Sequence, residues 1–212
     1  KDEVLKNLPR KFEKNIFIEL SEEELSVYKA IRTIFIKAIE TGISGRINSI
    51  ALEGLLRLRQ CCVSLNLLPK SLTHKGYVKS TKIELAVKMI KDFIADGHQI
   101  LVFSQFTSAL DELEERLTQD SVKLLLLTGN TRNRQVLVDS FQNDDKNKVF
   151  LISLKAGGTG LNLTAADRVI LLDDWWNPAV EEQATDRAYR IGQKRKVQVI
   201  KYVTKDSIEE KI

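Results

Sequence analysis

The sequence predicts an α/β fold in which helices flank a parallel β-sheet. Two observations support this prediction. From residue 80 onward, short continuous apolar runs, typical of strands buried on both faces, alternate with amphipathic helical segments. The 212 residues, 43% apolar and 29% charged, are also enough for one domain with a substantial core.

The first 79 residues are predicted to form a mostly helical N-terminal extension. Ser21 and Glu24 match a capping box, which opens a helix by satisfying free backbone amides in its first turn. Apolar residues then recur at helical spacing until a glycine stops the pattern. A second helix is expected over residues 46–63, and residues 65–79, with one proline and one glycine, are expected to form a loop.

Residues 80–212 are predicted to form the α/β domain itself. Helices are expected over residues 81–95, 107–117, 134–141 and 179–189. Strands are expected over residues 100–103, 122–127, 149–152, 169–172 and 197–203. Five such strands fit one sheet of the RecA or Rossmann type, and ligands of these sheets bind outside the carboxyl ends of the strands. The loops after residues 103, 127, 152 and 172 are therefore the expected functional region.

Net charge and cysteine content exclude only a few classes of function. The net charge of +4 suits a polyanionic partner, but many proteins without such a partner share it. Cys61 and Cys62 are adjacent and only two histidines exist in the chain, so we expect buried thiols in a reducing compartment and no metal site. Neither a membrane helix nor a signal peptide is expected, and the start without methionine indicates a fragment of a longer protein.

A glycine-rich segment follows the strand predicted at 149–152. Three glycines in four positions, at residues 157, 158 and 160, let a backbone approach a ligand closely and present amides to phosphate oxygens. Ser153 and Lys155 add a hydroxyl and a cation. A turn without any ligand remains an alternative, whereas a dinucleotide site is disfavoured because the G-x-G-x-x-G order is absent.

Two arginines are expected on one face of the helix predicted at 179–189. Gln183, Arg187 and Arg190 are spaced i, i+4 and i+7, so their side chains would leave the helix together. A solvated or ion-paired surface is one interpretation of this pattern. The other is a phosphoryl-transfer site, because paired guanidinium groups suit the spread charge of a transferring phosphoryl group.

The residues between that helix and the preceding strand read Asp-Asp-Trp-Trp-Asn-Pro, from residue 173 to 178. Paired acids are compatible with a metal, but no further acidic cluster accompanies them. The paired tryptophans are compatible with core packing or with a nucleic-acid backbone.

Taken together, these motifs resemble the second helicase lobe of the Swi/Snf-type ATPases, which belong to the superfamily-two helicases. The resemblance rests on SQF at 104–106, SLKAGGTGLNL at 153–163 and DDWWNPAVEEQATDRAYRIGQ at 173–193, and it covers nearly the whole chain. It implies a RecA-like lobe. The chain departs from the family pattern at Val63 and Ser64, where His-Pro is common, and in the short stretch 131–134.

The resemblance also implies a role for each matching residue. In this family two arginines, here Arg187 and Arg190, reach across a cleft between two lobes to the phosphates of ATP. Gly160, Asn162 and Gln183 are expected on the nucleotide side. The residues expected to face DNA are Gln105, Ser153, Lys155, Gly157 and Trp176.

The chain contains neither a G-x-x-x-x-G-K-[ST] phosphate loop nor a D-E-x-H motif. The resemblance places these motifs, and with them most contacts to ATP and Mg²⁺, on the first lobe. The full-length protein is therefore expected to be a DNA-dependent ATP hydrolase and translocase, whereas the isolated fragment is expected to be inactive.

Double-stranded DNA, the first lobe, and nucleosomes or other DNA-bound proteins are the expected partners. The location would be the nucleus in a eukaryote and the cytoplasm or nucleoid in a prokaryote. A Rossmann-type dinucleotide enzyme and a DNA-binding scaffold without motor activity remain as alternatives. Chromatin remodelling, repair and a prokaryotic role all stay open.

Overall fold

A central sheet of six parallel strands organises the computed structural model, which describes residues 8–41, 47–73, 76–156, 160–175 and 177–211. The sheet order is β1-β6-β5-β2-β4-β3. The strands are β1 (Lys11–Ile18), β2 (Ile100–Ser104), β3 (Leu124–Leu127), β4 (Val149–Ser153), β5 (Arg168–Leu171) and β6 (Val197–Thr204). The predicted parallel sheet flanked by helices is confirmed.

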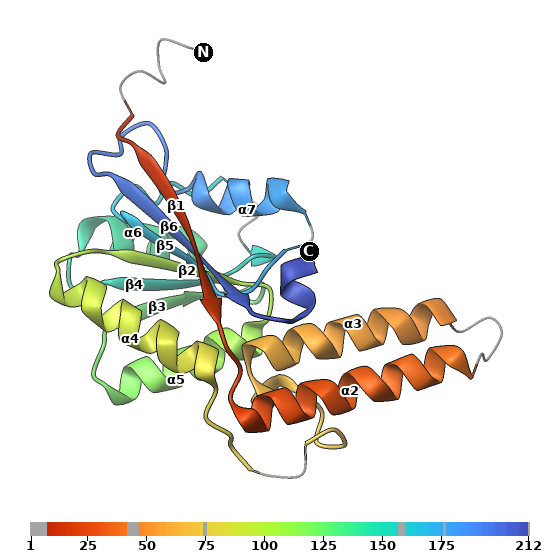
Figure 1. Cartoon of the computed structure of the whole chain (residues 1–212). Helices are drawn as coiled ribbons and strands as arrows, with labels where there is room; N and C mark the ends of the chain where they lie inside the picture. The colour runs from red at the N-terminus through yellow and green to blue at the C-terminus, as the bar shows by residue number, and fades with distance from the viewer. Residues whose placement is uncertain (1–7, 42–46, 74–75, 157–159, 176, 212) are drawn as a thin grey trace.

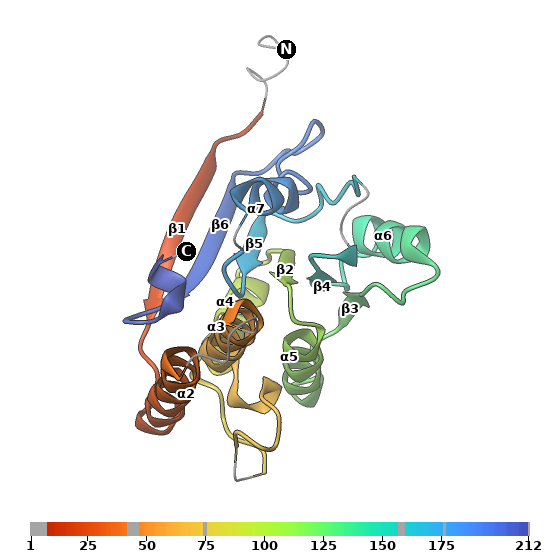
Figure 2. The same ribbon diagram turned by 90° about the vertical axis from the view of Figure 1, so that its right-hand side faces the viewer.

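Helices cover both faces of this sheet (Figures 1 and 2). The helices are α2 (Glu22–Glu40), α3 (Ile47–Val63), α4 (Thr81–Ala95), α5 (Thr107–Gln119), α6 (Arg134–Asn143) and α7 (Pro178–Thr185), with short 3-10 turns η1 (Leu65–Leu67) and η3 (Ile208–Lys211). Residues from α4 and α5 pack in one core, and residues from α6 and α7 pack in the other.

Each central strand contributes side chains to the hydrophobic cores on both sides of the sheet, because successive side chains of a strand point to opposite faces. In β2, Ile100 and Val102 lie in the core beneath α4 and α5. Leu101 and Phe103 lie in the core beneath α6 and α7. All five residues of β2 and of β4 are buried, which explains why these strands read as unbroken apolar runs.

Strand β1 was not predicted. It pairs with β6 from Lys11 opposite Val197 to Ile18 opposite Thr204 and forms one edge of the sheet. Most of its side chains are exposed, so it shows neither a continuous apolar run nor a clean alternation. Charged, exposed side chains are usual on edge strands because they discourage pairing with other chains. The N-terminal extension thus contributes a strand as well as helices; the boundary at residue 80 stays an interpretation.

Helices α2 and α3 form an antiparallel hairpin that projects from the body of the molecule (Figure 1). The predicted capping box at its start is confirmed: Ser21 Oγ accepts a bond from Glu24 N, and the Glu24 carboxylate accepts one from Ser21 N. A separate apolar cluster at its base includes Tyr28, Cys61 and Cys62. Both thiols are buried and unpaired, and burial raises the pKa of Cys62 to about 12.

A buried ion pair fastens the C-terminal turn η3 to the start of α4. Lys82 Nζ lies 2.7 and 2.9 Å from the two carboxylate oxygens of Glu209, and both side chains are 1% exposed. Glu209 also accepts a bond from Thr204 N at 2.7 Å, at the end of β6. Because the carboxylate accepts three hydrogen bonds from two donor groups, its burial is compensated.

Candidate functional site

A cavity of about 540 Å³ lies beside α7, where the turn after this helix meets the segment after the glycine-rich loop. Its lining includes Gly160, Gln183, Arg187 and Arg190, four of the five residues that the sequence assigned to nucleotide chemistry. The fifth, Asn162, is exposed two residues beyond Gly160. The chain therefore folds so that two motifs separated by more than 20 residues share one concave surface.

Arg187 is the most unusual group in this cavity. It is only 5% exposed, and two of its guanidinium nitrogens, Nε and Nη1, have no hydrogen-bond partner in the described part of the chain. The guanidinium carbon lies 5.9 Å from the centre of the Phe103 ring. Burial lowers the pKa of Arg187, yet a guanidinium remains charged in proteins. A buried cation with free donors is suited to an anion that approaches from outside.

Arg190 joins the two motifs directly. Its Nη1 donates a hydrogen bond of 3.1 Å to the backbone oxygen of Gly160, and its side chain is otherwise exposed. A second link runs through the backbone, from Leu163 N to Arg187 O at 3.0 Å. Movement of the segment after the glycine-rich loop would therefore shift the arginines as well.

The predicted helix at 179–189 is wrong in its length. Helix α7 ends at Thr185, so Arg187 and Arg190 lie in the following turn and the i, i+4, i+7 argument does not apply to them. Beyond Thr185 the backbone turns more tightly, since Arg187 N and Ala188 N donate to the oxygens of Ala184 and Thr185, three residues back. In the turn that follows, the oxygens of Arg187 and Ala188 accept bonds from Leu163 N and the Gln193 side chain. Gln183 and both arginines nevertheless reach the same cavity.

Gln193 is a residue whose role could not be predicted from the sequence. Its amide nitrogen lies within 3.1 Å of three backbone oxygens, those of Thr164, Ala166 and Ala188, and its oxygen accepts a bond from Arg195 N. Gly192 just before it has φ of 102°, a conformation that favours glycine. Its place at the end of the R-I-G-Q string was the available signal, but nothing in that string indicates its partners.

A second group of candidate residues lies at the carboxyl edge of the sheet, as predicted. Asp173, 3% exposed, accepts bonds from Ser104 Oγ, Gln105 N and Gln105 Nε2. Burial raises the pKa of this carboxyl, while the bonds from Ser104 and Gln105 oppose the shift. Gln105, a predicted DNA contact, thus uses its amide nitrogen to hold the loop after β5.

The other predicted DNA contacts differ in exposure. Ser153 is buried at the end of β4, whereas Lys155 is exposed two residues later. Gly157 and Trp176 lie outside the described residues. Among the members of this group that the structure describes, Lys155 carries an exposed cationic side chain.

The described residues offer neither a metal site nor a membrane-spanning helix. Among the described residues, no three histidine, cysteine or acidic side chains gather in a way that could hold a metal ion. Within the same part of the chain, every helix is too short or too polar to cross a bilayer.

Comparison with known families agrees with this geometry. Residues 81–192 match the helicase conserved C-terminal domain, and residues 1–67 match the SNF2-related domain. The chain is 39% identical over 215 residues to the putative ATP-dependent helicase/translocase YwqA of Bacillus subtilis, covering all of this chain and 23% of that protein. It is 43% identical over 156 residues to the ATP-dependent helicase FUN30 of Saccharomyces cerevisiae, covering 72% of this chain and 14% of that protein.

Solved structures show the same fold. The C-terminal part of the Fun30 ATPase domain superposes with a TM-score of 0.82 at 25% identity, covering 96% of this chain and 88% of that one. The Sulfolobus solfataricus SWI2/SNF2 ATPase core in complex with double-stranded DNA gives a TM-score of 0.80 at 30% identity, covering 100% and 44%. The RecA-like architecture is confirmed. The chain spans about a fifth of the length of the curated relatives it matches.

Proposed function

The chain belongs to the helicase C-terminal domain family, in its Swi/Snf-type branch, and from this premise we propose that it is the C-terminal lobe of an ATP-dependent translocase on double-stranded DNA. Relatives named ATP-dependent helicases and a similar ATPase core in complex with double-stranded DNA support this proposal. The observation that carries it is the buried Arg187, which lines the same cavity as Arg190 and whose Nε and Nη1 have no hydrogen-bond partner in the described part of the chain.

Arg187 and Arg190 act as arginine fingers in this proposal. Two guanidinium groups beside one cavity stabilise the negative charge that spreads over the phosphoryl oxygens during transfer. Gly160, Asn162 and Gln183 border the nucleotide. The first lobe holds the rest of ATP and the Mg²⁺, which supplies charge neutralisation at the phosphates when bound. The two lobes close on ATP and reopen after hydrolysis, so that their DNA contacts step along one strand.

The DNA side of the lobe is the carboxyl edge of the sheet. Gln105, Ser153, Lys155, Gly157 and Trp176 are the proposed contacts. Contacts to phosphates rather than to base edges make binding insensitive to sequence and strongly dependent on salt. Nucleosomes or other DNA-bound proteins are the proposed obstacles that such a motor displaces, in the nucleus of a eukaryote or the nucleoid of a prokaryote.

The decisive variant is Arg187→Ala in the full-length protein. We expect the steady-state ATPase rate to fall by about 10³- to 10⁵-fold, the usual effect of losing an arginine finger. The affinity for a DNA duplex should stay within about threefold, because one charge among many phosphate contacts is removed. Arg195→Ala is the matched control, because its side chain is 59% exposed and does not line the cavity.

A scaffold that has lost its motor would show no ATPase activity to lose, which separates that alternative from the motor. An Arg187→Ala protein that retained ATPase within about tenfold would contradict the arginine-finger role. The isolated 212-residue chain is expected to show no ATP turnover, and hydrolysis by it at the full-length rate would contradict the two-lobe site.

A further inference from the structure

The loop between β5 and α7 is held from several directions by polar contacts. Gln105 of the β2 end donates from its side chain to the Asp173 carboxylate at 2.6 Å and to Asp174 O at 3.3 Å. Arg59 of α3, 8% exposed, also donates to Asp174 O. This loop therefore joins the proposed DNA edge of the sheet to the first turn of α7.

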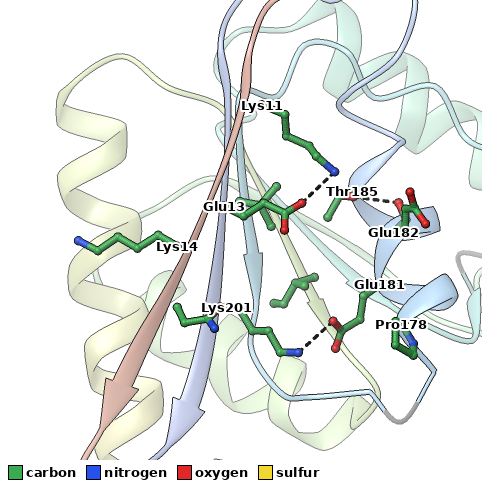
Figure 3. A pocket seen from close by; sticks show the side chains of 11 residues that line it. Lys11, Glu13, Lys14, Pro178, Glu181, Glu182, Thr185 and Lys201 are labelled. Atoms are coloured by element: carbon green, nitrogen blue, oxygen red, sulfur yellow. Dashed lines mark hydrogen bonds and ion pairs between the residues drawn. The ribbon is translucent and has the colours of Figure 1, made fainter. Parts of the chain in front are cut away.

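Glu181, in the first turn of α7, reaches back to the same loop. Its Oε1 accepts a hydrogen bond of 2.8 Å from Trp175 N, and its Oε2 lies 3.0 Å from Lys201 Nζ. Lys201 projects from β6 and also forms an ion pair with the Asp174 carboxylate. Figure 3 shows Lys201 and Glu181 pointing toward one another across the space between β6 and α7.

The polar contacts of Glu181 have a larger influence on the position of α7 because the face of this helix toward β1 and β6 is not closely packed. A cavity of about 310 Å³ separates the helix from β1 and β6, and Glu181, Lys201 and Thr185 line it (Figure 3). Where close packing is absent, a few polar contacts decide the position of a helix. The eight residues of α7 span about 12 Å as one rigid unit, so a shift at Glu181 is passed to the arginine turn that follows Thr185.

Partial burial strengthens the electrostatic attraction between Glu181 and Lys201. The side chains of Glu181 and Lys201 are 15% and 27% exposed, so water screens their attraction less than that of a surface pair. Burial raises the pKa of Glu181, and the bond from Trp175 N opposes that shift. The pair is therefore placed to hold one geometry of the loop relative to α7.

We propose that Glu181 and Lys201 are positioning residues that couple DNA contact at the carboxyl edge of the sheet to the placement of Arg187 and Arg190. The connection runs from Gln105 to the Asp173–Asp174 backbone and carboxylates, then through Lys201 and Glu181 to α7. This inference rests on the proposed function, and it adds two residues that do not line the nucleotide cavity.

The test is the ratio of DNA-stimulated to DNA-free kcat for ATP hydrolysis by the full-length protein. Glu181→Ala and Lys201→Met should lower this ratio by about 5- to 150-fold, the range of ordinary coupling between sites. Glu181→Gln should lower it less, because its amide oxygen still accepts the bond from Trp175 N. If Glu181→Ala fails to fold, the isosteric Glu181→Gln and the Lys201→Met protein decide the question.

Lys205→Met is the matched control, since Lys205 follows directly after β6 and also pairs with a glutamate, Glu19, but both side chains are exposed. An unchanged ratio in both Glu181→Ala and Lys201→Met would overturn the inference. A parallel fall of both rates, or an equal effect of Lys205→Met, would also overturn it, since each indicates a structural role. If Arg187→Ala abolishes hydrolysis while the ratio stays unchanged in these variants, the coupling alone fails and the proposed function stands.

Discussion

Gln193 illustrates how one buried side chain maintains the geometry of a site that it does not enter. Its exposed fraction is 6%, and its amide joins the segment after the glycine-rich loop, at Thr164 and Ala166, to the arginine turn at Ala188. Without this side chain, three carbonyl groups and Arg195 N would lose their partner. Each buried polar group left unpaired costs about 1–3 kcal/mol.

We therefore expect Gln193→Ala to lower the free energy of unfolding of the 212-residue chain by about 1–3 kcal/mol, because relaxation and water recover part of the loss. Urea unfolding followed by circular dichroism measures this difference. Gln183→Ala, at an exposed position of α7, serves as the control and should change stability by less than about 0.5 kcal/mol. Equal stability of the Gln193→Ala and wild-type chains would contradict the bracing role.

At the scale of elements, the α2–α3 hairpin depends on a close approach of its two helices. Gly54 lies in the middle of α3, and a Cβ added there would lie 2.7 Å from Phe35 Cγ and 2.9 Å from Phe35 Cβ. These atoms lie next to the backbone of α2, so the ring has little freedom to move aside. Glycine is retained in the helix at a propensity cost of about 1 kcal/mol because the packing requires it.

Two effects oppose one another in Gly54→Ala. Alanine favours the helix by about 1 kcal/mol, whereas overpacking costs about 1–3 kcal/mol. We expect the second to prevail and the thermal unfolding midpoint to fall. In a Phe35→Ala background the same substitution should become neutral or stabilising, and a double-mutant cycle measures that difference.

Gly129→Ala is the control for this prediction, because no atom lies within 4 Å of the added Cβ. A Gly54→Ala chain more stable than the wild type would show that the hairpin opens without cost, contrary to the packing described here.

At the scale of the whole molecule, several carboxyl groups are buried at a cost to their charged form. Burial raises the pKa of Glu112, Asp173 and Glu181. In each case the folded chain binds a proton more tightly than the unfolded chain. Stability contributed by the protonated form is therefore present at low pH and is lost as the pH rises from the unfolded pKa through the folded one.

Glu112 of α5 offers the clearest test of this pH dependence. Its Oε1 accepts a bond from Asn66 Nδ2 at 2.9 Å, while its buried Oε2 has no partner in the described part of the chain. Burial raises its pKa, and neighbouring polar groups, Asn66 among them, oppose the shift. At pH values above the raised pKa of Glu112, the Glu112→Gln chain should have a larger free energy of unfolding than the wild type. This difference in the free energy of unfolding should shrink as the pH falls toward 4.5, the ordinary glutamate pKa.

Chemical unfolding at a series of pH values measures that difference in the free energy of unfolding. Asp111 is an exposed neighbour on the same helix. The difference in the free energy of unfolding between Asp111→Asn and the wild type should therefore not grow with rising pH. A difference between wild type and Glu112→Gln that stays constant with pH would contradict the prediction.

The sequence determined those features whose physical cause is local or repeats along the chain. Strands buried on both faces must be apolar at every position, so β2 and β4 were visible as unbroken runs. The capping box of Ser21 and Glu24 satisfies neighbouring backbone groups, so it too could be recognised from spacing. The motifs at 104–106, 153–163 and 173–193 were enough to indicate the family, because each is a continuous run of residues that can be recognised without knowing the fold.

Tertiary structure alone decided three other features. Strand β1 is a strand because β6 offers it hydrogen-bond partners almost 190 residues away, and its own side chains are mostly exposed. Helix α7 ends at Thr185, and the turn after it is tied by Leu163 N and the Gln193 side chain to the oxygens of Arg187 and Ala188. The burial of Arg187, on which the proposed function depends, exists only in the folded chain. A periodicity of apolar residues carries no information about any of these three features.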